Sequence, residues 1–84
     1  MKMYYITFRS VTFAQRGETL LTKRGEICAL QRTPRWMEAQ GCGYALRVWT
    51  RDIAICLELL RSQKLLPRRV YVQGVDGQLE ELVL

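Results

Sequence analysis

The chain has 84 residues, of which 49% are hydrophobic and 25% are charged, and its formal net charge is +5. This length suits a single domain over residues 1–84 with one hydrophobic core, and it excludes a multidomain architecture. No apolar run approaches bilayer-spanning length and the first ten residues carry no apolar signal core, so we expect a cytoplasmic protein without membrane contact.

The first third of the chain predicts a strand, a helix and a second strand. Met3–Phe8 alternates β-forming side chains between two faces, which is typical of a strand. Ser10 then suits the N-cap of a helix that Gly25 ends, and Gly17 on its inner stripe indicates a close approach to a sheet. Glu26–Gln31 predicts the second strand.

The second half repeats this order. Tyr44–Trp49 predicts a third strand, Thr50 is the expected cap of a second helix, and Pro67 ends that region. The helix would bury a stripe made of Ile53, Cys56, Leu57 and Leu60. Arg69–Val75 predicts a fourth strand, and Asp76–Gly77 predicts a tight turn into a short C-terminal segment.

The order β-α-β-β-α-β predicts an α+β fold, a ferredoxin-like βαββαβ sandwich. We expect an antiparallel sheet with two helices on one face and a possible extra C-terminal strand. The other sheet face would stay open and carry four side chains, Tyr5, Arg47, Trp49 and Tyr71. Such a face could hold a second copy of the chain in a homodimer, or stack the bases of a single-stranded nucleic acid, which we rank lower.

Familiar enzyme chemistry is hard to build from these residues. The chain has no histidine, no glycine-rich phosphate loop and no paired carboxylates, so we expect no enzyme and no cofactor. Its three cysteines, Cys28, Cys42 and Cys56, form no CxxC pair, and we expect no metal site. The basic charge favours acidic partners, although a charge of this size also serves solubility.

The three cysteines differ in their surroundings. Cys56 lies on the apolar helix stripe and Cys28 shares its strand face with Leu30, so both are predicted to be core residues. Cys42 instead lies between Gly41 and Gly43 at the junction of a loop and a strand. Glycines leave a sulfur unshielded and let backbone N–H groups turn toward it, which would stabilise a thiolate.

The segment before Cys42 is long for a connection in a small domain, because about twelve residues from Arg32 to Gly43 show no period. Such loops are often functional. Arg35 and Arg47 are close to Cys42 in sequence and could lower its pKa further. Thr33–Arg35 is open to two interpretations, a plain turn out of a strand or part of a site around the thiol.

The stretches "YYITFRS", "LLTKRG", "TPR" and "GCGYALRV" resemble a family of small bacterial proteins described as putative selenium/sulfur carrier-like proteins (DUF3343). The resemblance covers the chain from Tyr4 to about Tyr71. Its most specific parts are "TPR" at Thr33–Arg35 and Cys42–Gly43. In that family the residue before Cys-Gly is commonly serine, so Gly41 removes a hydroxyl from the surroundings of the sulfur.

The resemblance implies a non-catalytic thiol carrier that holds sulfur or selenium on Cys42 as a persulfide or selenopersulfide. A donor enzyme would supply the atom and an acceptor enzyme would receive it. Arg35 and Arg47 would then stabilise the anion, with Gly43 and Thr33 in the same binding site. The absence of a neighbouring thiol fits this chemistry, because a second cysteine would expel the carried atom by forming a disulfide.

Two other functions remain open at this point. The chain could be a small protein-interaction module in which Cys42 is incidental. It could also bind single-stranded nucleic acid through the open sheet face, since "GYALRVW" partly matches an RNA-recognition pattern. In that match Cys42 replaces the leading basic residue and Leu46 the central aromatic, while Tyr44 has the parity of a core residue.

Overall fold

The computed structural model describes residues 1–33 and 43–82, and it confirms the predicted order of strands and helices. In chain order the elements are β1 (Lys2–Thr7), α1 (Val11–Lys23), β2 (Ile27–Arg32), β3 (Tyr44–Thr50), α3 (Ile53–Ser62), β4 (Arg69–Gln73) and β5 (Leu79–Leu82).

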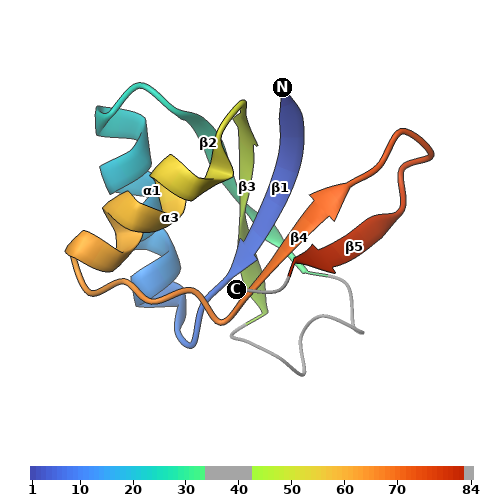
Figure 1. Ribbon diagram of the computed structural model, residues 1–84. Coiled ribbons are helices and arrows are strands. Elements are labelled where there is room, and N and C mark those ends of the chain that lie inside the picture. The colour runs from blue at the N-terminus through green and yellow to red at the C-terminus, as the bar shows by residue number, and fades with distance from the viewer. Residues whose placement is uncertain (34–42, 83–84) are drawn as a thin grey trace.

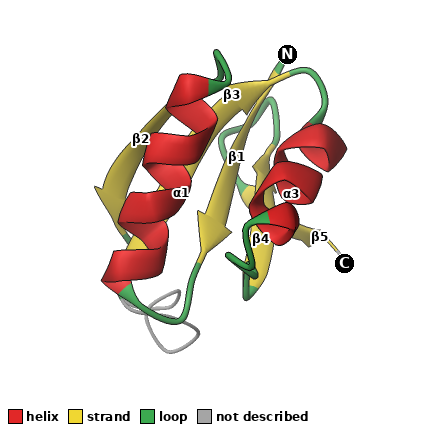
Figure 2. Cartoon of the chain, turned by 90° about the vertical axis from the view of Figure 1, so that its left-hand side faces the viewer, coloured by secondary structure: helices red, strands yellow, loops and turns green. Residues whose placement is uncertain are grey.

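The five strands form one sheet in the order β2-β3-β1-β4-β5, and each neighbouring pair is antiparallel. The first four strands therefore have the ferredoxin-like arrangement, and β5 is the extra C-terminal strand. Figure 1 shows α1 and α3 on one side of the sheet, and Figure 2 shows both helices in front of it. The fold is α+β, as predicted.

The core lies between the helices and the central strands. Side chains that alternate along β1, β3 and β4 turn toward the helices, which explains the period of two in these segments. The largest fully buried side chains of this core are Phe8, Ile6, Leu21, Leu46, Leu60, Val48, Val70 and Cys56. Gly17 lets α1 lie close to this layer, because a Cβ there would stand 3.2 Å from Leu60 Cδ2 and 3.3 Å from Phe8 Cζ.

The ends of α1 follow from its capping residues. The Ser10 hydroxyl accepts a hydrogen bond from the Phe13 backbone N–H at 3.1 Å, so Ser10 is the N-cap as predicted. Gly25 has a φ of +87°, and its N–H donates to the Thr22 carbonyl. Glycine adopts this left-handed conformation without the steric cost that a Cβ brings.

The start of α3 differs from the prediction, because Asp52 and not Thr50 is its N-cap. The Asp52 carboxylate accepts a hydrogen bond from the Ala54 N–H at 3.1 Å. Thr50 is still the last residue of β3, where it pairs with Lys2, and its hydroxyl accepts a hydrogen bond from the Asp52 N–H. The strand therefore includes the position that the sequence pattern assigned to the cap.

The sheet face away from the helices is only partly open. By register it carries Tyr5, Arg47, Trp49 and Tyr71, as expected. Tyr71, however, is only 5% exposed, because it packs with Ala45, Tyr5 and Leu79 in a second small apolar cluster. Within the described part of the chain, neither helix is long and apolar enough to cross a membrane.

Candidate functional site

A hydrogen-bonded pair lies where β2 ends and β3 begins, and it flanks the segment that carries the predicted thiol. The Thr33 N–H donates to the Gly43 carbonyl at 3.0 Å, one residue beyond the last ladder pair, Arg32 with Tyr44. Gly43 has a φ of +86°, a left-handed conformation that disfavours residues with a Cβ. The requirement for glycine at this position is thus conformational. The predicted site residues Cys42 and Arg35 lie outside the described residues.

Thr33 lines a cleft at this end of the sheet, on the face away from the helices. The cleft has a volume of about 180 Å³ and is lined by Tyr5, Gln31, Arg32, Thr33, Ala45, Gln73, Gly77 and Leu79. Thr33 is 8% exposed, and its buried hydroxyl oxygen has no hydrogen-bond partner among the described residues. No acidic side chain lines the cleft, so its lining is neutral or basic.

The arginines of β3 and β2, Arg47 and Arg32, lie at different distances from Gly43. Arg47 is exposed on the helix-free face, where it pairs across the ladders with Ala29 and Tyr5. Four residues of strand place its Cα about 13 Å from that of Gly43. Its predicted role near the thiol stays a prediction. Arg32 lies closer, at the end of β2, and sequence reasoning did not single it out.

Arg32 is held by an aromatic ring. Its guanidinium carbon lies 5.4 Å from the centre of the Tyr44 ring, within the range of a cation–π interaction. The two residues are ladder partners across β2 and β3, although they are twelve positions apart in sequence. Only the register of the sheet reveals this contact, and no local motif indicates it.

Cys56 is a core residue, as predicted. Its side chain is fully buried, and its Sγ donates a hydrogen bond to Glu26 Oε1 at 3.4 Å. Burial, followed by the hydrogen bond to the nearby Glu26 carboxylate and its charge, raises the pKa of the Cys56 thiol to about 12. At neutral pH this sulfur is therefore a protonated thiol enclosed by apolar side chains.

The surroundings of Cys28 also disfavour its thiolate form. It is half-buried in β2 and packs against the core, again as predicted. Its Sγ donates to the Glu18 carbonyl at 3.7 Å and lies 3.5 Å from the Thr22 hydroxyl. Burial is the largest cause that raises the pKa of Cys28, and the charges of Glu18 and Glu26 add to it against the opposing hydrogen bond from Thr22.

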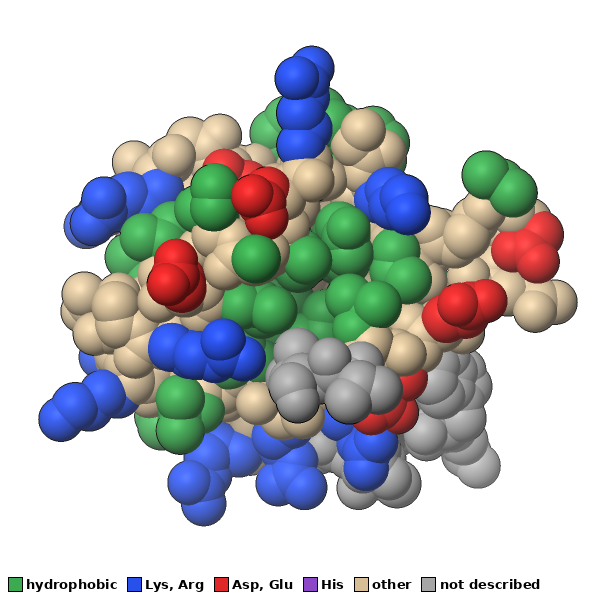
Figure 3. Space-filling model, in the orientation of Figure 1, with side chains coloured by type: hydrophobic (Ala, Val, Ile, Leu, Met, Phe, Trp, Pro, Cys, Tyr) green, Lys and Arg blue, Asp and Glu red, His purple; other side chains and the backbone are tan. Residues whose placement is uncertain are grey.

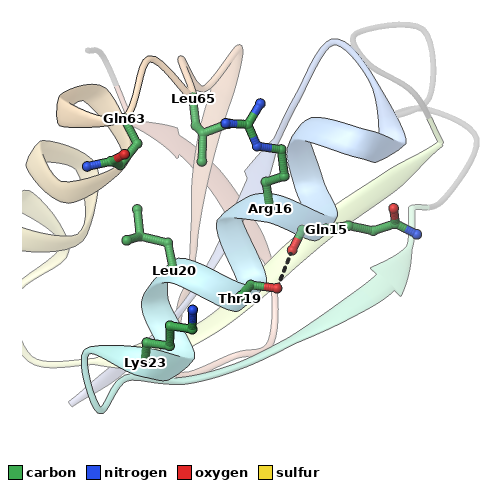
Figure 4. A pocket seen from close by; sticks show the side chains of 7 residues that line it. All are labelled: Gln15, Arg16, Thr19, Leu20, Lys23, Gln63 and Leu65. Carbon is green, nitrogen blue, oxygen red and sulfur yellow. Dashed lines mark hydrogen bonds between the residues drawn. The ribbon is translucent and has the colours of Figure 1, made fainter.

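The described residues offer no other obvious centre for chemistry. None of their His, Cys, Asp and Glu side chains group in a way that could hold a metal ion. A hollow of about 400 Å³ lies between α1 and the end of α3 and is shown in Figure 4, where Leu20 and Leu65 point into it. Its polar lining comes from side chains such as Arg16, Lys23 and Gln63, and it contains no thiol.

Comparison with known proteins identifies the family. Residues 3–72 match the family model described as "Putative Se/S carrier protein-like". No curated protein and no solved structure matches the chain at a significant level. The match covers most of the 84 residues, including β2, β3, both helices and all but one residue each of β1 and β4. The chain therefore belongs to the putative Se/S carrier protein-like family.

Proposed function

We propose that this protein is a carrier that holds a sulfur or selenium atom on Cys42. The observation that supports it best is the state of the other two thiols. Cys28 and Cys56 are packed against the core, and burial, together with the nearby carboxylates, raises their pKa values. A carrier cysteine must be an accessible thiolate, so neither of them suits the task. Cys42 is the remaining cysteine of the chain.

The transfer is balanced without an external oxidant or reductant. The Cys42 thiolate attacks the terminal sulfur of a persulfide on a donor enzyme, and a new S–S bond forms as the donor S–S bond breaks. The donor cysteine leaves as a thiolate, and Cys42 becomes a persulfide. An acceptor enzyme then attacks the terminal atom and Cys42 leaves as a thiolate. A selenopersulfide passes a selenium atom by the same steps.

The residues around the thiol have proposed roles of their own. Thr33 and Gly43 fix the two ends of the segment that carries Cys42 through their 3.0 Å hydrogen bond. Arg35 and Arg47 would stabilise the anionic terminal atom by their charge. The chain would act stoichiometrically, taking up one atom on Cys42 from a donor and giving it to an acceptor, with no catalysis of its own.

Intact mass spectrometry tests this proposal. The protein is incubated with a cysteine desulfurase and cysteine, then desalted and weighed without reductant. We expect an adduct of one sulfur atom on the wild type and on the matched control Cys28→Ser, and none on Cys42→Ser. An adduct that persists on Cys42→Ser would place the sulfur on another cysteine, and a wild type without an adduct would contradict the carrier function for sulfur.

A further inference from the structure

Three arginines from distant parts of the sequence lie at one end of the sheet. Arg32 is the last residue of β2, Arg9 follows the end of β1, and Arg68 directly precedes β4. The register fixes their proximity, because the Arg68 N–H donates to the Thr7 carbonyl of β1 at 2.8 Å. Since β3 and β1 lie between β2 and β4, the Cα atoms of Arg32 and Arg68 are about 14 Å apart. We call Arg9, Arg32 and Arg68 the arginine end.

The charges of the arginine end are not compensated within the described part of the chain. All three side chains are exposed. The single ion pair among the described residues joins Arg69 to Glu81, at 2.7 Å, and uses none of the three. The first turn of α1, which begins two residues after Arg9, contains no acid. In Figure 3 lysine and arginine side chains gather along the lower edge of the molecule, where β1 ends.

Exposed apolar side chains accompany these charges. Val11, the first residue of α1, is 38% exposed, and Leu66, two residues before Arg68, is 60% exposed. Apolar groups with arginines beside them are the combination that protein–protein interfaces favour. The arginine end therefore offers both charge and apolar surface to a partner.

The composition of this surface favours a protein over a nucleic acid. Single-stranded nucleic acids are held by basic grooves with aromatic side chains on which the bases stack. Of the described aromatic residues only Trp49 is exposed, and six residues of strand place it about 20 Å from Gly43. Tyr44 is half-buried beneath Arg32 and is not free to stack.

We propose that the arginine end is the docking surface for an acidic protein, and that this protein is the donor or acceptor required by the carrier function, on which this part of the inference rests. Gly43, which a peptide bond joins to Cys42, directly precedes β3, and β3 lies between β2, which ends at Arg32, and β1, which Arg9 follows. A carboxylate-rich patch would meet guanidinium groups that bind carboxylates in a bidentate way. Docking there would bring the partner to the segment that contains the thiol.

The test measures docking without thiol chemistry, by titrating isotope-labelled protein with an oligoglutamate peptide that contains leucines. The double variant Arg9→Glu/Arg68→Glu is compared with the control Lys2→Glu/Arg51→Glu, which makes the same change in net charge at the opposite end of β1 and β3. All four side chains are exposed, so both variants should fold. We expect amide shifts around Val11, Thr33 and Gly43 that weaken with salt.

The expected loss of affinity is roughly tenfold in Arg9→Glu/Arg68→Glu and less than about twofold in the control. Equal losses of affinity in both variants would show that peptide binding depends only on the net charge of the protein, and would overturn the proposal. The absence of peptide binding at low salt would overturn it as well. Tighter binding of an oligothymidylate of equal charge would assign the surface to nucleic acid instead. Peptide binding by a protein that takes up no sulfur would keep the acidic docking surface while removing the carrier function.

Discussion

The assignment of the carrier role to Cys42 depends on the unreactivity of the other two thiols, and this can be measured in the variant Cys42→Ser. The rise of the pKa of Cys56 from its ordinary value of 9.0 to about 12 lowers its thiolate fraction at pH 8 about a thousandfold. Alkylation proceeds through the thiolate, so the rate at Cys56 should fall by at least the same factor. Full burial of the side chain slows the reagent further.

The assay follows iodoacetamide labelling of native Cys42→Ser by mass spectrometry at several pH values, with a free thiol peptide as the reference. Cys28 should also label more slowly than the reference, because burial and the two glutamates raise its pKa. Cys56→Ala in the same background identifies which thiol reacts. A Cys56 rate within about tenfold of the reference at pH 8 would refute the reasoning, because both the raised pKa and the burial predict much slower labelling.

Glu26→Gln provides a further check on the physical cause. The substitution removes the negative charge that disfavours the Cys56 thiolate, so the pKa of Cys56 should fall. It should not return to 9.0, because burial is the largest cause of the rise. The pH at which labelling of Cys56 begins should therefore move down in this variant, and an unchanged profile would mean that Glu26 does not act on the thiol.

Two further predictions concern stability and can be measured by urea unfolding. Lys64 has a φ of +60° just after α3, so Lys64→Gly should raise the free energy of unfolding by about 0.5–1 kcal/mol, and a loss would contradict the cost assigned to this conformation. Gly17→Leu should lower it by about 2 kcal/mol or more, because even a Cβ at Gly17 lies 3.2 Å from Leu60, whereas Gln15→Leu on the exposed face of α1 should change it little.

Most of the fold could be predicted from local patterns. The alternation in β1, the helical stripe of α3 and the Ser10 cap each depend on residues a few positions apart, and the structure confirms them. The end of α3 carries no such signal, because Lys64 takes the left-handed conformation that usually marks a glycine. The prediction of Thr50 as a cap was wrong because its pairing with Lys2, 48 positions away, extends β3.

The candidate site was less predictable for the same physical reason. Gly43 was singled out from the sequence for its place beside Cys42, whereas its left-handed φ of +86° was not predicted. The cation–π contact of Arg32 and the placement of Arg68 beside the end of β1 could not be predicted, because they depend on strand register across the whole sheet. The roles predicted for Cys42, Arg35 and Arg47 stay predictions.

The hydrogen bond between Thr33 and Gly43 also has a consequence for engineering. Because it holds both ends of the connection at adjacent positions of an antiparallel pair, a short turn could replace residues 34–42 without stretching β2 or β3. Closing a shorter loop also costs less entropy. The sheet and helices would then serve as a scaffold whose remaining thiols are Cys28 and Cys56. Connections of other lengths could be inserted into this scaffold and compared for sulfur uptake.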